Sequence, residues 1–189
     1  GEAATLDEAV RRAQALGYAE PDPAADIGGR DAADKLLLLL RDCAGVSVRA
    51  ADLEVTGIDG VTAAHFAAAR GHGGVIKPVV HASIEDDGVR AWVAPAFVPR
   101  GHPLASVDGA LNGICLAGRF VPELFFSGPG AGPDVTAATL VDDLVEIARE
   151  PRGPNAGLPR EAPPAARPLR ASGGRWVCAG GRDFRVVER

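Results

Sequence analysis

The chain of 189 residues contains no methionine, three cysteines and few aromatic side chains, which make up 5% of the sequence. Cys43, Cys115 and Cys178 are odd in number and far apart. We therefore expect free thiols in a reducing compartment, with the cytoplasm as the default location, rather than a disulfide framework. The four histidines, at positions 65, 72, 81 and 102, do not follow metal-ligand spacing, and no metal site is expected.

A block of basic residues is also missing. The formal net charge is −5, which makes nucleic acid and anionic membrane surfaces poor partners for this chain. We expect no signal peptide, and the apolar runs are too short to span a bilayer. The run of leucines from 36 to 40, for example, is followed at once by Arg41 and Asp42.

Lysine is scarce, since only Lys35 and Lys77 among the 20 basic residues are lysine. If arginine supplies the ordinary surface cations, the two lysines are candidates for work that arginine cannot do. Lysine can exchange a proton once it is desolvated, whereas arginine is effectively never deprotonated. The common alternative for Lys35 is an exposed helical ion pair with Asp31, four residues earlier.

Residues 17 to 35 place five acids and Lys35 around a turn. Pro21 and Pro23 favour an extended segment, and Gly28 and Gly29 indicate a turn before a helix. Five consecutive leucines follow Lys35, so we expect this helix to be largely buried and Lys35 to emerge at a protein-lined surface.

This stretch reads GYAEPDPAADIGGRDAADK and resembles the substrate-binding and catalytic signature of the homoserine dehydrogenases. That signature is Gly-Tyr-x-Glu-x-Asp-Pro, then Asp-x-x-Gly-x-Asp and a Lys four residues on. Further segments fall in the family's order, and the resemblance covers roughly residues 5 to 150: GVIK at 74–77, HPLA at 102–105, GPGAG at 128–132, Thr136-Ala137 and Asp143-Leu144. The chain departs from the family at Thr56, Gly113 and Val135, where Glu, Ala and Pro are usual.

The resemblance implies a role for each matching residue in interconverting homoserine and aspartate semialdehyde, a step of amino-acid biosynthesis. Lys35 is the implied acid/base, and Asp31 orients it and the substrate hydroxyl. Glu20 and Asp26 receive the substrate ammonium, while Tyr18 and Gly17 line the pocket. Because a zwitterionic substrate also needs a cation for its carboxylate, Lys77 is the candidate for that contact. The loop with Gly130 and Gly132 is implied to approach the nicotinamide end of NAD(P).

The patterns predict an α+β fold, a mixed sheet with helices packed on one face. Helices are expected over residues 5–16, 61–70 and 136–149, and strands over 47–56, 74–84, 89–98, 111–118 and 121–126. Thr5 and Glu8 predict a capping box at the start of the first helix, and Asp87-Gly88 predicts a hairpin turn between the strands over 74–84 and 89–98. A first domain is expected over residues 1–150, for catalysis, substrate binding and dimerisation. A Pro/Arg-rich linker follows over 151–172, and a short hairpin over 173–189.

The sequence contains no G-x-G-x-x-G unit between a strand and a helix, which nicotinamide dinucleotides normally require. We therefore expect the family's dinucleotide-binding domain to lie outside these residues, in a separate chain or in a part that was cut away, and hydride transfer to depend on it. The family resemblance also implies a homodimer held by strands between residues 74 and 126. Two other classes stay open: an amino-acid-binding module without redox chemistry, and a lyase or cyclase that reuses Lys35.

Overall fold

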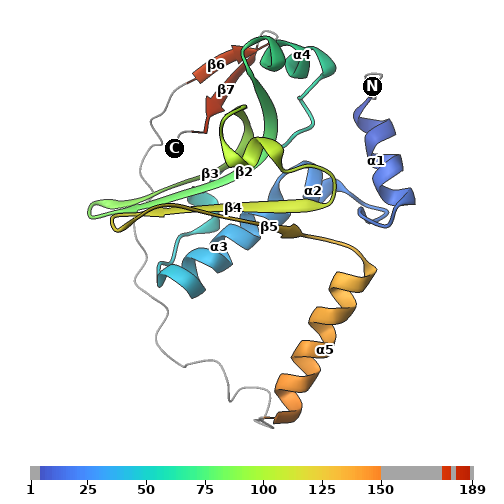
Figure 1. Ribbon diagram of the computed structural model, residues 1–189, viewed down its shortest axis with the longest axis vertical. Coiled ribbons are helices and arrows are strands. Elements are labelled where there is room, and N and C mark those ends of the chain that lie inside the picture. Colours follow the sequence, from blue (N-terminus) through green and yellow to red (C-terminus); the bar gives the residue numbers. More distant parts are fainter. Residues whose placement is uncertain (1–4, 150–175, 180–181, 188–189) are drawn as a thin grey trace.

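The computed structural model describes residues 5–149, 176–179 and 182–187 (Figure 1). The predicted linker over 151–172 lies outside the described residues, as does the side chain of Cys178. The helices are α1 (Leu6–Ala15), α2 (Ala24–Ile27), α3 (Arg30–Ala44), α4 (Ala63–Gly71) and α5 (Pro133–Arg149), with short 3-10 turns η1 (Ala50–Asp52) and η2 (Pro103–Ser106). The strands are β1 (Glu54–Val55), β2 (Gly74–Glu85), β3 (Gly88–Pro99), β4 (Leu111–Gly118), β5 (Val121–Pro129), β6 (Trp176–Ala179) and β7 (Arg182–Val186).

Strand β3 is the centre of a five-stranded mixed sheet. It pairs along its whole length with the antiparallel strand β2, through the hairpin that the Asp87-Gly88 turn predicted. Its other edge pairs in parallel first with β1 and then with β7, which in turn pairs with the antiparallel β6. The C-terminal hairpin therefore adds to this sheet at the edge of β3.

Both faces of β3 are covered, which explains its nearly continuous apolar sequence. On one face, Val89, Ala91 and Val93 pack against α3, and Phe97 packs with residues of α4 and β7. On the other face, Trp92 and Val98 lie in a cluster that includes residues of η2. The main helices thus share one face of a mixed sheet, as the sequence predicted.

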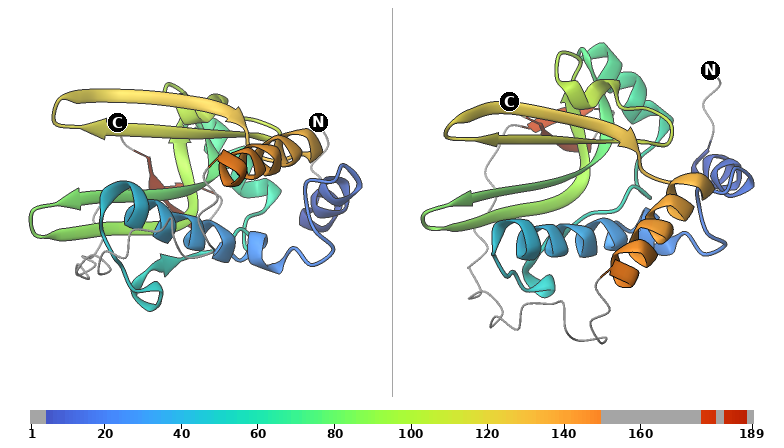
Figure 2. Two further views of the ribbon diagram at one scale, coloured as in Figure 1. Left: turned by 90° about the horizontal axis from the view of Figure 1, so that it is seen from below. Right: turned by 60° about the horizontal axis from the view of Figure 1, so that its bottom comes forward.

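Strands β4 and β5 form a separate two-stranded ribbon that lies over the face opposite α3 (Figure 2). Its inward side approaches η2: a Cβ atom added at Gly113 would lie 2.6 Å from Val107 Cγ2 and 3.0 Å from Leu104 Cδ2. This close approach gives a reason for glycine where the family usually has alanine, because a methyl group would force η2 away from the ribbon.

Helices α1 and α5 lie at the periphery and bury no residue within the described structure. Helix α1 begins with the capping box that the sequence predicted, in which Thr5 Oγ1 accepts from the Glu8 N–H and Glu8 Oε2 accepts from the Thr5 N–H. None of the described helices is both long and apolar enough to cross a membrane.

Two local expectations were wrong. The strand expected over residues 47–56 is reduced to the two residues of β1, because residues 50–52 close a 3-10 turn that Arg49 and Asp52 stabilise with an ion pair. Helix α3 is less buried than its leucines suggested: Leu36 and Leu40 point into the core, while Leu38 and Leu39 are more than half exposed. A helix has only one face toward the sheet, whatever its composition.

Candidate functional site

A cleft of about 1330 Å³ opens where α1, the start of α3 and the ends of the β4–β5 ribbon meet. It brings together side chains and loop residues that are up to 123 positions apart in the sequence, counting from Glu8 to Ala131. Those that matter for the chemistry are Arg12, Tyr18, Asp26, Lys35, Asn112 and Gly130. Four of them, Tyr18, Asp26, Lys35 and Gly130, were singled out from the sequence.

Lys35 and Asp31 face each other on the first turns of α3. Lys35 Nζ donates to Asp31 Oδ2 at 2.6 Å, the i, i+4 geometry that one helix face provides. The expectation of a protein-lined Lys35 needs correction, since its side chain is 69% exposed. It projects from the helix into the open cleft, because the helix buries a different face, that of Ala33 and Leu36.

The segment before α3 carries the other predicted substrate residues. Tyr18 and Asp26 line the cleft, whereas Gly17 and Glu20 do not line it in this conformation. Gly17 ends α1 with a φ of 75°, a conformation that glycine adopts without strain. The backbone carbonyl of Glu20 accepts from Gln14 Nε2 at 2.9 Å, which ties the segment back to α1.

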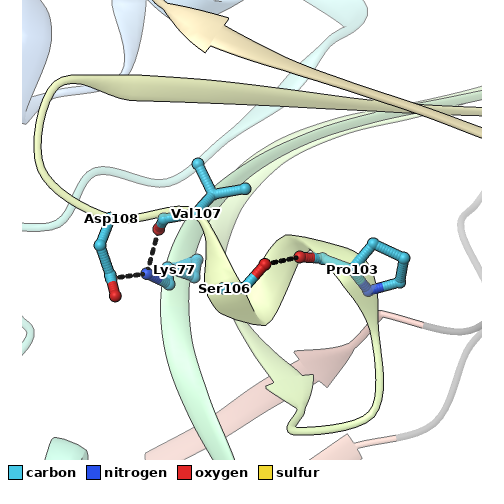
Figure 3. A network of polar contacts seen from close by, with 5 residues as sticks. All are labelled: Lys77, Pro103, Ser106, Val107 and Asp108. Carbon is cyan, nitrogen blue, oxygen red and sulfur yellow. Dashed lines mark hydrogen bonds and ion pairs between the residues drawn. The ribbon is translucent and has the colours of Figure 1, made fainter.

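Lys77, the predicted carboxylate-binding cation, is engaged elsewhere (Figure 3). Its Nζ donates to the Val107 carbonyl at 2.5 Å and to Asp108 Oδ1 at 2.6 Å, and its side chain is only 21% exposed. It does not line the cleft. Lys77 fixes the loop between η2 and β4, so the structure gives it a positioning geometry and leaves the predicted substrate contact without support.

The glycine-rich loop after β5 borders the cleft through Gly130 and Ala131. A Cβ atom at Gly130 would collide with the amide group of Asn112, and the Gly130 N–H donates to the Ala110 carbonyl at 2.9 Å. Gly130 is therefore needed for packing against β4. Gly132 has a φ of 131°, and no atom lies within 4 Å of the place that a Cβ atom would take there, so its outer side is open.

The structure also joins three residues that sequence spacing did not connect. Ligand atoms of His102, Cys115 and Glu123 lie within 4.8 Å of one another. His102 Nδ1 already accepts the Leu104 N–H at 3.2 Å and caps η2, so a neutral ring carries its proton on Nε2. Burial, followed by the nearby charge of Glu123, raises the pKa of the Cys115 thiol. A metal would have to displace both protons, and the group is better described as structural.

Sequence reasoning missed Arg12 and Asn112 as cleft residues. Arg12 lies on α1, which the sequence showed only as an amphipathic helix, and its position beside the cleft depends on the path of the chain through residues 16–23. Asn112 lies on β4, and its pairing with Gly128 near the end of β5 places its side chain next to Gly130.

Comparison with known proteins gives this arrangement a family. The homoserine dehydrogenase family model matches residues 1–145. A homoserine dehydrogenase of Mycobacterium leprae is 40% identical over 171 residues, which are 84% of this chain and 39% of the relative. The chain spans less than two-fifths of the length of the first curated relatives it matches.

Solved structures agree. A homoserine dehydrogenase from Thiobacillus denitrificans superposes with a TM-score of 0.71 at 34% identity, covering 84% of this chain and 37% of the other. A hyperthermophilic archaeal homoserine dehydrogenase mutant in complex with NADPH superposes with a TM-score of 0.58 at 26% identity, covering 78% of this chain and 41% of the other. The chain therefore belongs to the homoserine dehydrogenase family.

Proposed function

We propose that this chain is the substrate-binding and catalytic part of an NAD(P)-dependent homoserine dehydrogenase that interconverts homoserine and aspartate semialdehyde. The observation that carries the proposal is that Lys35, which is paired with Asp31, lines the same cleft as Asp26, Tyr18 and the Gly130 loop. The product would serve the aspartate family of amino acids, including threonine and methionine, and the expected location is the cytoplasm.

In this mechanism Lys35 handles the proton of the substrate hydroxyl. During oxidation a neutral Lys35 Nζ accepts that proton as the carbonyl forms, and during reduction Nζ returns it. The Asp31 carboxylate, 2.6 Å away, restricts the rotation of the lysine side chain and keeps Nζ aimed along the helix face toward the cleft. Asp26, which lines the cleft, holds the substrate ammonium, and the family resemblance assigns Glu20 to the same ammonium. Tyr18 also lines the cleft.

The nicotinamide end of the cofactor would supply hydride chemistry at the side-chain carbon of the substrate. The described residues fit only that end of the cofactor, because Gly132 leaves open space beside the cleft, while no described loop has the G-x-G-x-x-G spacing that holds the phosphates. Binding of the rest of the cofactor is assigned to a dinucleotide-binding domain, in this protein or in a separate chain.

We also propose a homodimer, with the outward face of the β4–β5 ribbon as its contact. A two-stranded ribbon is marginal alone in water, yet the directly paired side chains on this face are 45% to 55% exposed: Ile114, Leu116, Leu124 and Phe126. A second copy of the same face would cover this apolar surface and satisfy two-fold symmetry. We choose a second copy of this chain as the partner because a two-fold contact lets each copy bury its own four apolar side chains against the same four of the other copy.

The cleft itself can be tested with one reporter. Tyr18 is the chain's single tyrosine, so incorporation of fluorotyrosine gives one fluorine NMR signal from inside the cleft. Titration with L-homoserine should move this signal in a saturable way, and Asp26→Asn should weaken the response. Asp34→Asn, on the exposed face of α3, is the matched control and should respond like the wild type. No shift at millimolar homoserine would remove the basis of the proposal.

If the chain binds homoserine but does not turn it over when a dinucleotide-binding domain is supplied, the alternative of an amino-acid-binding module is favoured. A lyase or cyclase would instead consume homoserine in the absence of nicotinamide, which chromatography of the incubated substrate detects.

A further inference from the structure

The substrate of the proposed function carries a carboxylate, and the cation predicted for it is not available. Lys77 is committed to the Val107 carbonyl and Asp108, away from the cleft. Lys35 is paired with Asp31 and is assigned to the hydroxyl at the other end of the substrate. The cleft must supply another positive group if it holds a zwitterion.

Arg12 is the cationic side chain that lines the cleft besides Lys35. It lines the cleft together with Glu8 and Leu16, which lie one turn before and one turn after it on the same face of α1. Its neighbour Arg11 does not line the cleft, because successive residues of a helix point in different directions.

The charge of Arg12 is not used within the described structure. No described side chain forms an ion pair with it, and the nearest candidate on its helix is already occupied: Glu8 Oε2 accepts the Thr5 N–H at 2.8 Å. That hydrogen bond is also the main cause of the lowered pKa of Glu8. A positive charge makes a smaller contribution to the lowered pKa, and this charge is that of Arg11 rather than Arg12. An unpaired guanidinium beside a cleft is open to an anionic ligand.

We propose that the Arg12 guanidinium binds the α-carboxylate of the amino-acid substrate. This rests on the proposed function and extends it, because the cleft then offers one group for each polar part of the substrate. Asp26 receives the ammonium, Arg12 the carboxylate and Lys35 the hydroxyl. Arg12 thereby selects amino acids over amino alcohols of the same length.

The chemistry suits arginine. Its planar guanidinium presents two parallel N–H donors that match the two oxygens of a carboxylate, and such charge-assisted pairs are stronger than neutral hydrogen bonds. A lysine at this position would supply charge without the fork. Arg12→Lys should therefore keep part of the affinity, and Arg12→Gln should lose it.

To test this, the fluorotyrosine-labelled chain is titrated with L-homoserine and with 3-aminopropan-1-ol, which is homoserine without its carboxylate. Arg12→Gln should weaken homoserine binding by roughly ten- to hundred-fold, the worth of a hydrogen bond to a charged group. Its affinity for aminopropanol should stay at the wild-type value, because that ligand has nothing for Arg12 to hold. Arg11→Gln, one residue away and off the cleft, is the control and should bind both ligands like the wild type.

The outcomes separate this inference from the function on which it rests. Equal homoserine affinity in Arg12→Gln and Arg11→Gln, with a wild-type response intact, would overturn the Arg12 assignment alone. Equal losses for homoserine and aminopropanol would also overturn it, since the variant would then have disturbed the cleft as a whole. A wild-type chain that responds to neither ligand would overturn the proposed function together with the inference.

Discussion

The C-terminal hairpin should be an integral part of the fold, and Phe184 tests this. Phe184 lies on β7, is 1% exposed and packs with Ala69, Ile76 and Phe97. Its ring also meets the His65 ring edge-on at a centroid distance of 5.5 Å. Removing a ring from such a site costs both the transfer free energy of the ring and the cavity that remains. Phe184→Ala should therefore lower the free energy of unfolding by about 3–5 kcal/mol.

For a chain of this size each kcal/mol corresponds to roughly 2–4 °C, so the melting temperature should fall by about 6–20 °C. Differential scanning calorimetry and urea titration would measure the two quantities. Phe120→Ala is the matched control, because Phe120 is 88% exposed and its loss should cost less than about 0.5 kcal/mol. A Phe184→Ala protein as stable as the control would show that β7 does not dock on β3 in solution, and the position of the hairpin would have to be revised.

Two further predictions concern the assembly and the sheet surface. Leu124→Asp should turn the proposed dimer into a monomer, because two-fold symmetry places the new charge on both sides of the contact. Sedimentation at micromolar concentration checks this, and a wild-type chain that sediments as a monomer would contradict the proposal. His81 stacks on Trp92 at 5.2 Å, and the resulting desolvation of its ring, with a smaller effect of the Arg185 charge, lowers the pKa of His81 from its ordinary value. The unfolded chain then binds more protons just below pH 6.5, so stability should fall as the pH drops into that range, and His81→Gln should flatten the urea midpoints there.

The sequence was sufficient for the fold class because its patterns are local. The two strand segments over residues 74–84 and 89–98, with the Asp87-Gly88 turn between them, predict the β2–β3 hairpin, and the capping box predicts the start of α1. Tyr18, Asp26, Lys35 and Gly130 could be named from the motifs, but the motifs did not show how exposed Lys35 is. Five leucines indicated a buried helix, yet which of them face the sheet depends on packing partners that lie more than 45 residues away, such as Val89 and Val93.

Long-range contacts explain the remaining differences. Lys77 was predicted to bind the substrate carboxylate partly because lysine is scarce in this chain. Its partner in the structure, Asp108, lies 31 positions away and was not predictable from sequence spacing. The group of His102, Cys115 and Glu123 forms because the β4–β5 ribbon folds over η2. Arg12 enters the cleft because the extended segment that follows α1 turns the helix back toward Lys35.

The central claim is that Lys35 transfers the proton of the substrate hydroxyl, and turnover of one variant tests it most directly. Lys35→Arg keeps the charge and the partner Asp31 but cannot release a proton at neutral pH. In an enzyme that joins this chain to a dinucleotide-binding domain, kcat for homoserine oxidation should fall by about 100-fold or more, with KM changed little. Lys77→Arg, the other lysine and the control, should retain most of its turnover, because arginine can still donate to Asp108. Turnover of Lys35→Arg at the wild-type rate would contradict the account.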